Sequence, residues 1–145
     1  MADSATAVAA WEALFRAQVG VMRRLAADFP TQRMSFNEYD VLFNISRQPQ
    51  RRIRLRDLNQ HVLLTQPSVS RLIDRLAGRG YVCKVPDPGD GRGTIVAMTE
   101  EGQAEFRAVA LIHVRSIDRH LSAVLDEDEL DELRGLCAKL HRGVA

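Results

Sequence analysis

Apolar side chains in the middle of the chain recur with a helical period in two successive patterns, and strand-like runs follow. The first pattern, at i, i+3 and i+7, predicts a short helix over 55–62. The second, at i, i+3, i+4 and i+7, predicts a longer helix that begins after Thr65 and ends at Gly78 and Gly80. Thr65 is suited to an N-cap, and Pro67 to the first turn, where its missing N–H costs nothing. The two apolar stripes consist of Leu55, Leu58 and Val62, and of Val69, Leu72, Ile73 and Leu76.

Two β-prone runs come directly after the second helix. Residues 81–85 and 94–98 predict two strands of a hairpin. The segment 86–93 between them holds three glycines and two prolines, and it has no side chain that builds a core. Because this loop is too long for a tight hairpin turn, it is expected to project from the protein.

The N-terminal part of the chain predicts two more helices. Residues 5–28 carry one apolar face, and Pro30 ends that helix. Ser35 and Glu38 have the spacing of a capping box, which predicts a helix that stops before Pro49.

The C-terminal part predicts a further pair of helices. Thr99 caps the first and Asp126 caps the second. Together with residues 5–28, these helices carry more apolar surface than a small domain covers by itself. Pairing with a second copy of the chain is the economical way to bury it.

The order of a short helix, a longer helix and a hairpin is typical of a winged helix-turn-helix, in which the second helix enters the DNA major groove. The fold class is therefore predicted as mainly α with a small β-hairpin wing (α+β). The outward face of the second helix combines short hydrogen-bonding groups with arginine, as base-reading surfaces do. On this helix alone, an ordinary solvated face explains the pattern equally well. The outward residues are Gln66, Ser68, Ser70, Arg71, Asp74 and Arg75.

The predicted wing has a candidate DNA contact near its tip. Arg92 suits a minor groove, whose potential is negative. Asp90 is placed to hold the Arg92 guanidinium extended through a charge-assisted hydrogen bond. A plain polar hairpin explains the loop, but it does not explain why the loop follows a recognition-like helix.

A run of arginines precedes the first of the two central helices. A solvated loop and a phosphate-contacting surface account for it about equally well. Its members are Arg47, Arg51, Arg52, Arg54 and Arg56.

Taken together, these residues resemble the MarR family of winged helix-turn-helix regulators (multiple antibiotic resistance regulators), over nearly the whole chain. The matching segments are 66–76, Gly80-Tyr81-Val82, Asp87-Pro88, Asp90-Gly91-Arg92 and 98–102. The chain departs from the family pattern at Gly93, where many members carry a second wing arginine, and at Cys83-Lys84, where Glu-Arg is common. Arg92 would therefore make the wing contact almost alone.

The resemblance implies one MarR-like domain over 1–145, with a DNA-binding region over 35–98 and dimerisation helices over 5–30 and 99–143. It implies a two-fold homodimer on a palindromic double-stranded DNA operator, and a small effector of the aromatic or phenolic acid type. No cofactor is expected, and no residue is assigned to the effector. The residues expected at the DNA are Arg54, Thr65, Gln66, Pro67, Ser68, Ser70, Arg71, Arg75, Lys84, Asp90 and Arg92.

The charge distribution favours DNA more than the net charge of +1 does. Residues 47–92 hold ten Lys/Arg against four Asp/Glu, whereas residues 93–145 hold six against ten. Basic charge is concentrated in the expected reading module, as a DNA-binding surface requires.

Several classes of protein are disfavoured. No apolar run approaches the roughly 18–20 residues of a membrane span, and Met1 to Ser4 contain no basic residue of a secretory signal, so a cytoplasmic protein is expected. Cys83 and Cys137 lie far apart without a C-x-x-C pattern, which argues against a zinc site. Phosphate-binding and hydrolase motifs are absent from the sequence, so no catalytic residue and no enzymatic activity are expected.

The interpretation is a homodimeric, ligand-responsive transcriptional regulator, most simply a repressor. The competing hypothesis is a winged-helix module that binds a partner protein and no specific DNA. A DNA-binding titration against salt separates the two, because phosphate contacts give a steep slope.

Overall fold

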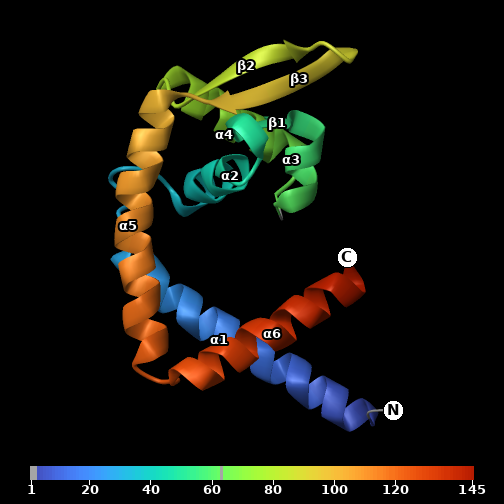
Figure 1. Ribbon diagram of the computed structural model, residues 1–145, viewed down its shortest axis with the longest axis vertical. Coiled ribbons are helices and arrows are strands. Elements are labelled where there is room, and N and C mark those ends of the chain that lie inside the picture. The colour runs from blue at the N-terminus through green and yellow to red at the C-terminus, as the bar shows by residue number, and fades with distance from the viewer. Residues whose placement is uncertain (1–2, 63) are drawn as a thin grey trace. The chain divides into compact units, whose positions relative to one another are not determined.

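The computed structural model describes residues 3–62 and 64–145, which form two compact units, 30–112 and 1–29 with 113–145. Figure 1 shows the order of the elements, which confirms the mainly helical fold with a small β-hairpin. The elements are α1 (Ser4–Asp28), α2 (Phe36–Ser46), a 3-10 turn (Pro49–Arg51), β1 (Arg52–Arg54), α3 (Leu55–His61), α4 (Gln66–Gly78), β2 (Val82–Asp87), β3 (Asp90–Met98), α5 (Glu100–Ser122) and α6 (Glu127–Val144).

The helix termini follow the predicted capping residues. Ser35 accepts a hydrogen bond from the N–H of Glu38, and the Glu38 side chain accepts one from the N–H of Ser35, so α2 begins with a complete capping box. Thr65 caps α4, and Asp126 caps α6 with the same reciprocal arrangement. The N–H of Gly102 donates to Thr99 Oγ1 at 2.9 Å, which confirms Thr99 as the cap of α5.

A three-stranded antiparallel sheet in the order β1-β3-β2 lies in the unit 30–112. The hairpin pairs Val82 with Met98 at its base and Asp87 with Asp90 at its tip. On the other side of β3, Arg52 pairs with Ala97 and Arg54 with Ile95. The strand β1 is therefore an edge strand that joins the arginine-rich segment to the wing.

The sequence predictions were wrong about the extent of this sheet. The segment 86–93 is mostly strand, and only Pro88 and Gly89 lie between β2 and β3. Pro86 is tolerated because β2 is an edge strand and the register is irregular between Pro86 and Asp87. The third strand was missed altogether because three residues with two arginines among them carry little strand signal.

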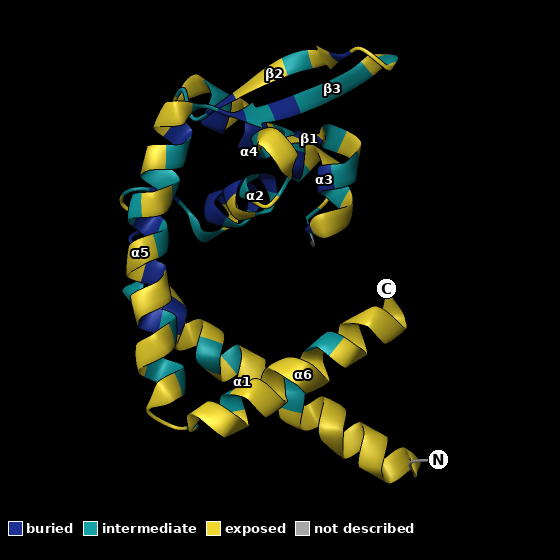
Figure 2. Ribbon diagram, viewed as in Figure 1, coloured by how far each residue is buried: buried dark blue, intermediate teal, exposed yellow. Residues whose placement is uncertain are grey.

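The core of the unit 30–112 is built from the inward stripes of its helices. Val69 and Leu76 in α4, Leu58 in α3 and Leu42 in α2 are fully buried. Val96 of β3 is fully buried as well. Figure 2 shows buried residues on α2 and along β3.

The other unit consists of α1, the C-terminal half of α5, and α6. The carboxylate of Asp28 at the end of α1 accepts hydrogen bonds from Ser116, at 2.7 Å, and Arg119, at 2.6 Å, and His120 Nε2 lies 2.7 Å from it. Phe29 packs edge-on against His113, with ring centroids 5.4 Å apart. These contacts fix the end of α1 against α5.

Much of the apolar surface of this unit is exposed. No residue of α6 is buried, and Leu136 and Leu140 are 61% and 51% exposed. In α1, Trp11 and Phe15 are 60% and 51% exposed, and they contact each other. Figure 2 shows α6 and the N-terminal half of α1 almost entirely in the exposed colour. The face of α1 that could have been core is therefore mostly open in the single chain.

Candidate nucleic-acid interface

The outward face of α4 carries the side chains that the sequence analysis expected there. Val69, Leu72, Ile73 and Leu76 are at most 4% exposed, so the stripe faces inward. Ser68 and Ser70 are partly exposed on the helix, and the remaining outward residues are open to solvent. The exposed residues are Gln66, Pro67, Arg71, Asp74 and Arg75.

The first turn of α4 is ordered by its own hydroxyl groups. Thr65 Oγ1 accepts a hydrogen bond from the N–H of Ser68 at 3.4 Å and donates one to Ser68 Oγ at 2.9 Å. The Arg71 guanidinium donates to the same Ser68 oxygen at 3.3 Å. Base contacts come mainly from the N-terminal turns of a recognition helix. The hydrogen bond to Ser68 limits the conformations of the Arg71 side chain in this part of α4.

Three exposed arginines of the interface have no carboxylate partner. Among residues 3–62 and 64–145, no ion pair involves Arg71, Arg75 or Arg92. Lys84 differs, because its Nζ lies 2.6 Å from Asp74 Oδ1 and links β2 to α4. Arg71, Arg75 and Arg92 are therefore exposed cations that form no direct ion pair with a carboxylate of the described residues.

The wing is anchored by a buried carboxylate whose role the sequence did not reveal. Asp87 is 4% exposed, and its Oδ2 lies 2.8 Å from Arg54 Nε. Its Oδ1 accepts the N–H of Gly89 at 2.9 Å. The predicted contact of Arg54 with DNA stays a prediction, and in the structure its guanidinium ties β1 to the tip of the wing. Asp87 was predicted to lie in the loop 86–93, where a charged side chain gives no signal of burial.

The predicted contact between Asp90 and the Arg92 guanidinium is wrong. Asp90 Oδ1 accepts the backbone N–H of Arg92 at 3.1 Å, and Asp90 Oδ2 lies 3.8 Å from Arg56 Nη1. Asp90 therefore shapes the backbone of the wing tip and leaves the Arg92 side chain exposed. The physical reason is that a strand places residues i and i+2 on one side, where the nearer N–H competes successfully for the carboxylate.

A hollow of about 300 Å³ lies between α3, α4 and the wing, within the unit 30–112. Asn59 is a lining residue that sequence reasoning missed, and its buried Oδ1 accepts no hydrogen bond from the described part of the chain. The hollow brings Gln66 and Ser70 of α4 together with Asp90 and Arg92 of the wing. The full lining is Arg54, Leu55, Arg56, Asn59, Gln66, Ser70, Asp87, Asp90, Arg92, Gly93 and Thr94.

The described residues offer neither a metal site nor a membrane span. Within 3–62 and 64–145, no three His, Cys, Asp or Glu side chains gather so that they could hold a metal ion. In the same ranges, none of the helices combines the length and the apolar character needed to cross a membrane.

Comparisons with known proteins point to one family. A family model described as MarR family matches residues 34–93. The chain is 25% identical to the transcriptional regulator PecS of Dickeya dadantii over 130 residues, which cover 89% of this chain and 78% of PecS.

Solved structures share the fold. The MarR family regulator Sco3205 of Streptomyces coelicolor, solved in complex with DNA, superposes with a TM-score of 0.81 at 21% identity and covers 100% of this chain and 92% of its own. BpsR of Bordetella bronchiseptica, whose DNA binding is regulated by 6-hydroxynicotinic acid, gives 0.77 at 21% identity and covers 91% of this chain and 98% of its own. The relatives named here are regulators and not enzymes.

Proposed function

Because the chain belongs to the MarR family of DNA-binding transcriptional regulators, we propose that it is a homodimeric repressor that acts in the cytoplasm on a palindromic operator. The recognition helix is α4, which reads bases in the major groove, and the wing β2–β3 contacts the adjacent minor groove. The residues at the DNA are those of the α4 outward face and the wing, with Arg54 and Asp90 supporting the wing.

The observation that carries this proposal is the set of exposed arginines on α4 and the wing that form no ion pair among the described residues. Arg71 and Arg75 lie on the helix, and Arg92 lies on the wing. Positive side chains without carboxylate partners are free to replace counterions on phosphate or to pair with guanine edges. A helix and a hairpin that present them together suit two neighbouring grooves of one duplex.

The homodimer is supported by the exposed apolar surface of the unit made from 1–29 and 113–145. Leu133, Leu136 and Leu140 of α6 are each more than 40% exposed. Full burial of a leucine contributes about 1.5–3 kcal/mol, so such a stripe is a strong driving force for association. A two-fold axis would present two α4 helices to two half-sites.

The effector is proposed to be a small aromatic or phenolic acid that lowers operator affinity. The structural neighbour BpsR, which is regulated by 6-hydroxynicotinic acid, supports this class of compound. Repression is relieved if the effector favours a form of the dimer that binds operator weakly.

The proposal is tested by selecting bound sequences from a random pool of DNA duplexes. We expect a palindromic motif whose half-sites are one helical turn apart, about 10 bp from centre to centre. The affinity for this motif should fall steeply with salt. A pool that shows no enrichment, together with a flat salt dependence, would indicate a protein-interaction module instead.

Base reading by α4 is tested with Arg71→Ala. We expect a loss of about 1–3 kcal/mol in discrimination between the selected motif and random DNA. Arg107→Ala is the matched control, because Arg107 is an exposed arginine of the same compact unit but lies on α5. Equal losses on motif and random DNA would reassign Arg71 to phosphate contact.

A further inference from the structure

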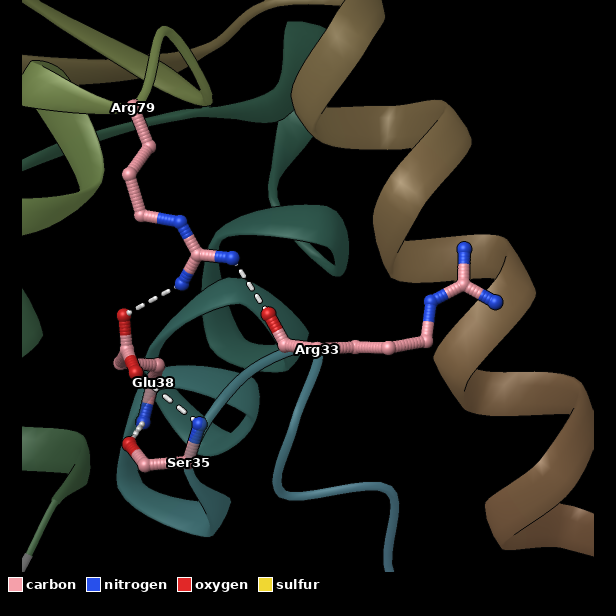
Figure 3. A network of polar contacts seen from close by, with 4 residues as sticks. All are labelled: Arg33, Ser35, Glu38 and Arg79. Carbon is pink, nitrogen blue, oxygen red and sulfur yellow. Dashed lines mark hydrogen bonds and ion pairs between the residues drawn. The ribbon is translucent and has the colours of Figure 1, made fainter.

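Arg79 directly follows the recognition helix α4, and its side chain is held by groups that lie outside the proposed DNA interface. It is the C-cap of α4. Its Nη1 donates to Glu38 Oε2 at 3.2 Å, and its Nη2 donates to the backbone carbonyl of Arg33. Its guanidinium also stacks over the ring of Tyr81 at 4.8 Å. Figure 3 shows the two hydrogen bonds of this side chain diverging to Glu38 and Arg33.

Glu38, the acceptor on α2, is buried and fully engaged. One carboxylate oxygen completes the capping box with the N–H of Ser35 at 2.9 Å, and the other faces Arg79. Burial raises the pKa of Glu38, but the hydrogen bonds from Ser35 and the charges of Arg79 and Arg75 outweigh it, so the pKa lies below its usual range. A buried carboxylate that loses its cationic partner is left with uncompensated charge.

Arg33 extends the same network to α5. Its carbonyl accepts from Arg79, while its side chain makes two hydrogen bonds to the Glu105 carboxylate, at 2.8 and 2.9 Å. Figure 3 shows the Arg33 side chain directed away from Arg79, towards the ribbon of α5. The segment 30–35, the start of α2, the end of α4 and α5 are thus joined by one set of polar contacts within the unit 30–112.

We propose that Arg79 is a positioning residue for DNA recognition: its contacts with Glu38 and Arg33 set the orientation of α4, so that operator affinity depends on residues that do not touch DNA. This inference rests on the proposed function of α4 as a recognition helix.

The length of α4 explains why its far end matters. Its 13 residues span roughly 20 Å at about 1.5 Å per residue. A tilt of about 10° at the C-terminal end therefore moves the N-terminal turn by roughly 3 Å, whereas a binding constellation tolerates only about 0.5 Å. The reading residues near Ser68 and Arg71 lie at that moving end.

The test compares Glu38→Gln, Arg79→Gln and the double variant on the selected operator and on random DNA. Glutamine at 38 can still serve a capping box, so α2 keeps its start while the ionic partner of Arg79 is lost. We expect each single variant to weaken operator binding about tenfold. Random DNA should bind within about twofold of wild type, and the salt slope should not change. The double variant should be little weaker than Arg79→Gln alone, because that change already removes the Arg79–Glu38 pair.

The sign of the Glu38→Gln effect separates positioning from charge. If only long-range electrostatics acted, removing an acid from the DNA-binding unit would tighten binding. Asp57→Asn is the matched control, because it removes one acid of the same unit that forms no ion pair among the described residues. Tighter operator binding by Glu38→Gln overturns the proposal. The proposal is also overturned if Arg79→Gln weakens the binding of operator and random DNA equally and lowers the salt slope by about 0.9. Arg79 would then be a phosphate contact.

Two further measurements keep the test decisive. Arg79→Lys retains the charge but offers a single point of donation in place of a fork, so its operator affinity should lie between wild type and Arg79→Gln. In Arg79→Gln without DNA, hydrogen exchange should be faster than in wild type at the amides of Gly80 and Tyr81. These amides donate to the carbonyls of Ala77 and Leu76 at the end of α4. Unchanged exchange and unchanged operator affinity overturn the inference and leave the proposed function standing. Failure of the wild type to select any operator overturns the function, while the exchange result still reports whether Arg79 holds α4.

Discussion

At the scale of single residues, the arginines of the reading unit have two roles. Arg54 and Arg79 are bound to buried carboxylates, Asp87 and Glu38, and they hold backbone segments in place. Arg71 and Arg92 are exposed and unpaired within the described residues, so their charge remains available to a ligand. Burial of the partner distinguishes the two groups, because a buried carboxylate requires a cation, whereas a solvated one does not.

The wing tip offers a residue-scale prediction. Asp90→Ala should weaken operator binding although it removes an acid from the DNA-facing surface, because the Arg92 N–H loses its acceptor at 3.1 Å and the tip loses its shape. Asp90→Asn keeps an acceptor oxygen and should bind nearly as wild type does. Operator affinity at fixed salt decides, and tighter binding by Asp90→Ala would mean that Asp90 acts only as a charge.

A second residue-scale prediction concerns acid. Hydrogen bonds from Ser116, His120 and Arg119 lower the pKa of Asp28 from 3.8 to about 2. Because the folded pKa is lower than the unfolded one, this group stabilises the fold above about pH 4, and the contribution is lost as pH falls through about 2. Asp28→Asn should therefore be less stable than wild type at pH 6, and the difference should shrink towards pH 2. Urea unfolding across this range measures it, and a constant difference would contradict the assignment.

At the scale of elements, local capping determines where the helices begin, whereas a close backbone approach fixes α5 against its neighbours. The Thr99 hydroxyl donates to the Gly80 carbonyl at 2.6 Å while accepting the N–H of Gly102. The Thr99 N–H donates to the Tyr81 carbonyl at 3.0 Å. The start of α5 is thereby bound to the turn that ends α4, where Gly80 has a φ of 80°.

Gly102 is the position that permits this approach. A Cβ there would lie 2.0 Å from the Tyr81 carbonyl oxygen, so Gly102→Ala must push α5 away from the turn. We expect a loss of about 1–3 kcal/mol in the free energy of unfolding, the usual effect of overpacking. Gly78→Ala is the control, because no atom lies within 4 Å of its added Cβ. It should be neutral or stabilising by up to about 1 kcal/mol. Equal effects of the two changes in chemical denaturation would show that the approach at Gly102 is not tight.

At the scale of the whole molecule, the two compact units differ in charge and in exposed surface. The unit 30–112 holds twelve Lys/Arg against nine Asp/Glu, and the other unit holds eight against ten. The basic unit carries the wing and α4, while the acidic one carries the exposed leucines of α6. This separation suits a protein that binds phosphate with one unit and a second copy of itself with the other.

The corresponding prediction is an obligate dimer. Leu133→Asp combined with Leu136→Asp should yield monomers in sedimentation velocity, because charges replace the apolar stripe of an interface expected to bury on the order of 2,000 Å² or more. Glu132→Gln on the same exposed helix should remain dimeric. A wild-type protein that sediments as a folded monomer at micromolar concentration would refute the dimer, and with it the expected palindromic operator.

Periodicity and capping chemistry in the sequence were enough to predict the helices and the face that α4 exposes. Val69, Leu72, Ile73 and Leu76 had to face inward because apolar burial is the main driving force of folding, and Ser35, Thr65, Thr99 and Asp126 cap helices through contacts within three residues. Such signals are local, so they can be read without knowing the fold. The family resemblance of the segment 66–102 added the DNA-binding role.

Only the tertiary structure decided which charged residues meet. Arg79 and Glu38 are 41 positions apart, and Arg33 and Glu105 are 72 apart. No spacing rule links such residues, because their distance depends on how separate elements pack. The same holds for Arg54, which was expected at the DNA: its pairing with Asp87 arises only once β1 aligns beside β3. The sequence by itself thus determined the helices and the chemistry of their exposed faces, while packing decided the extent of the sheet and which arginines pair with buried carboxylates.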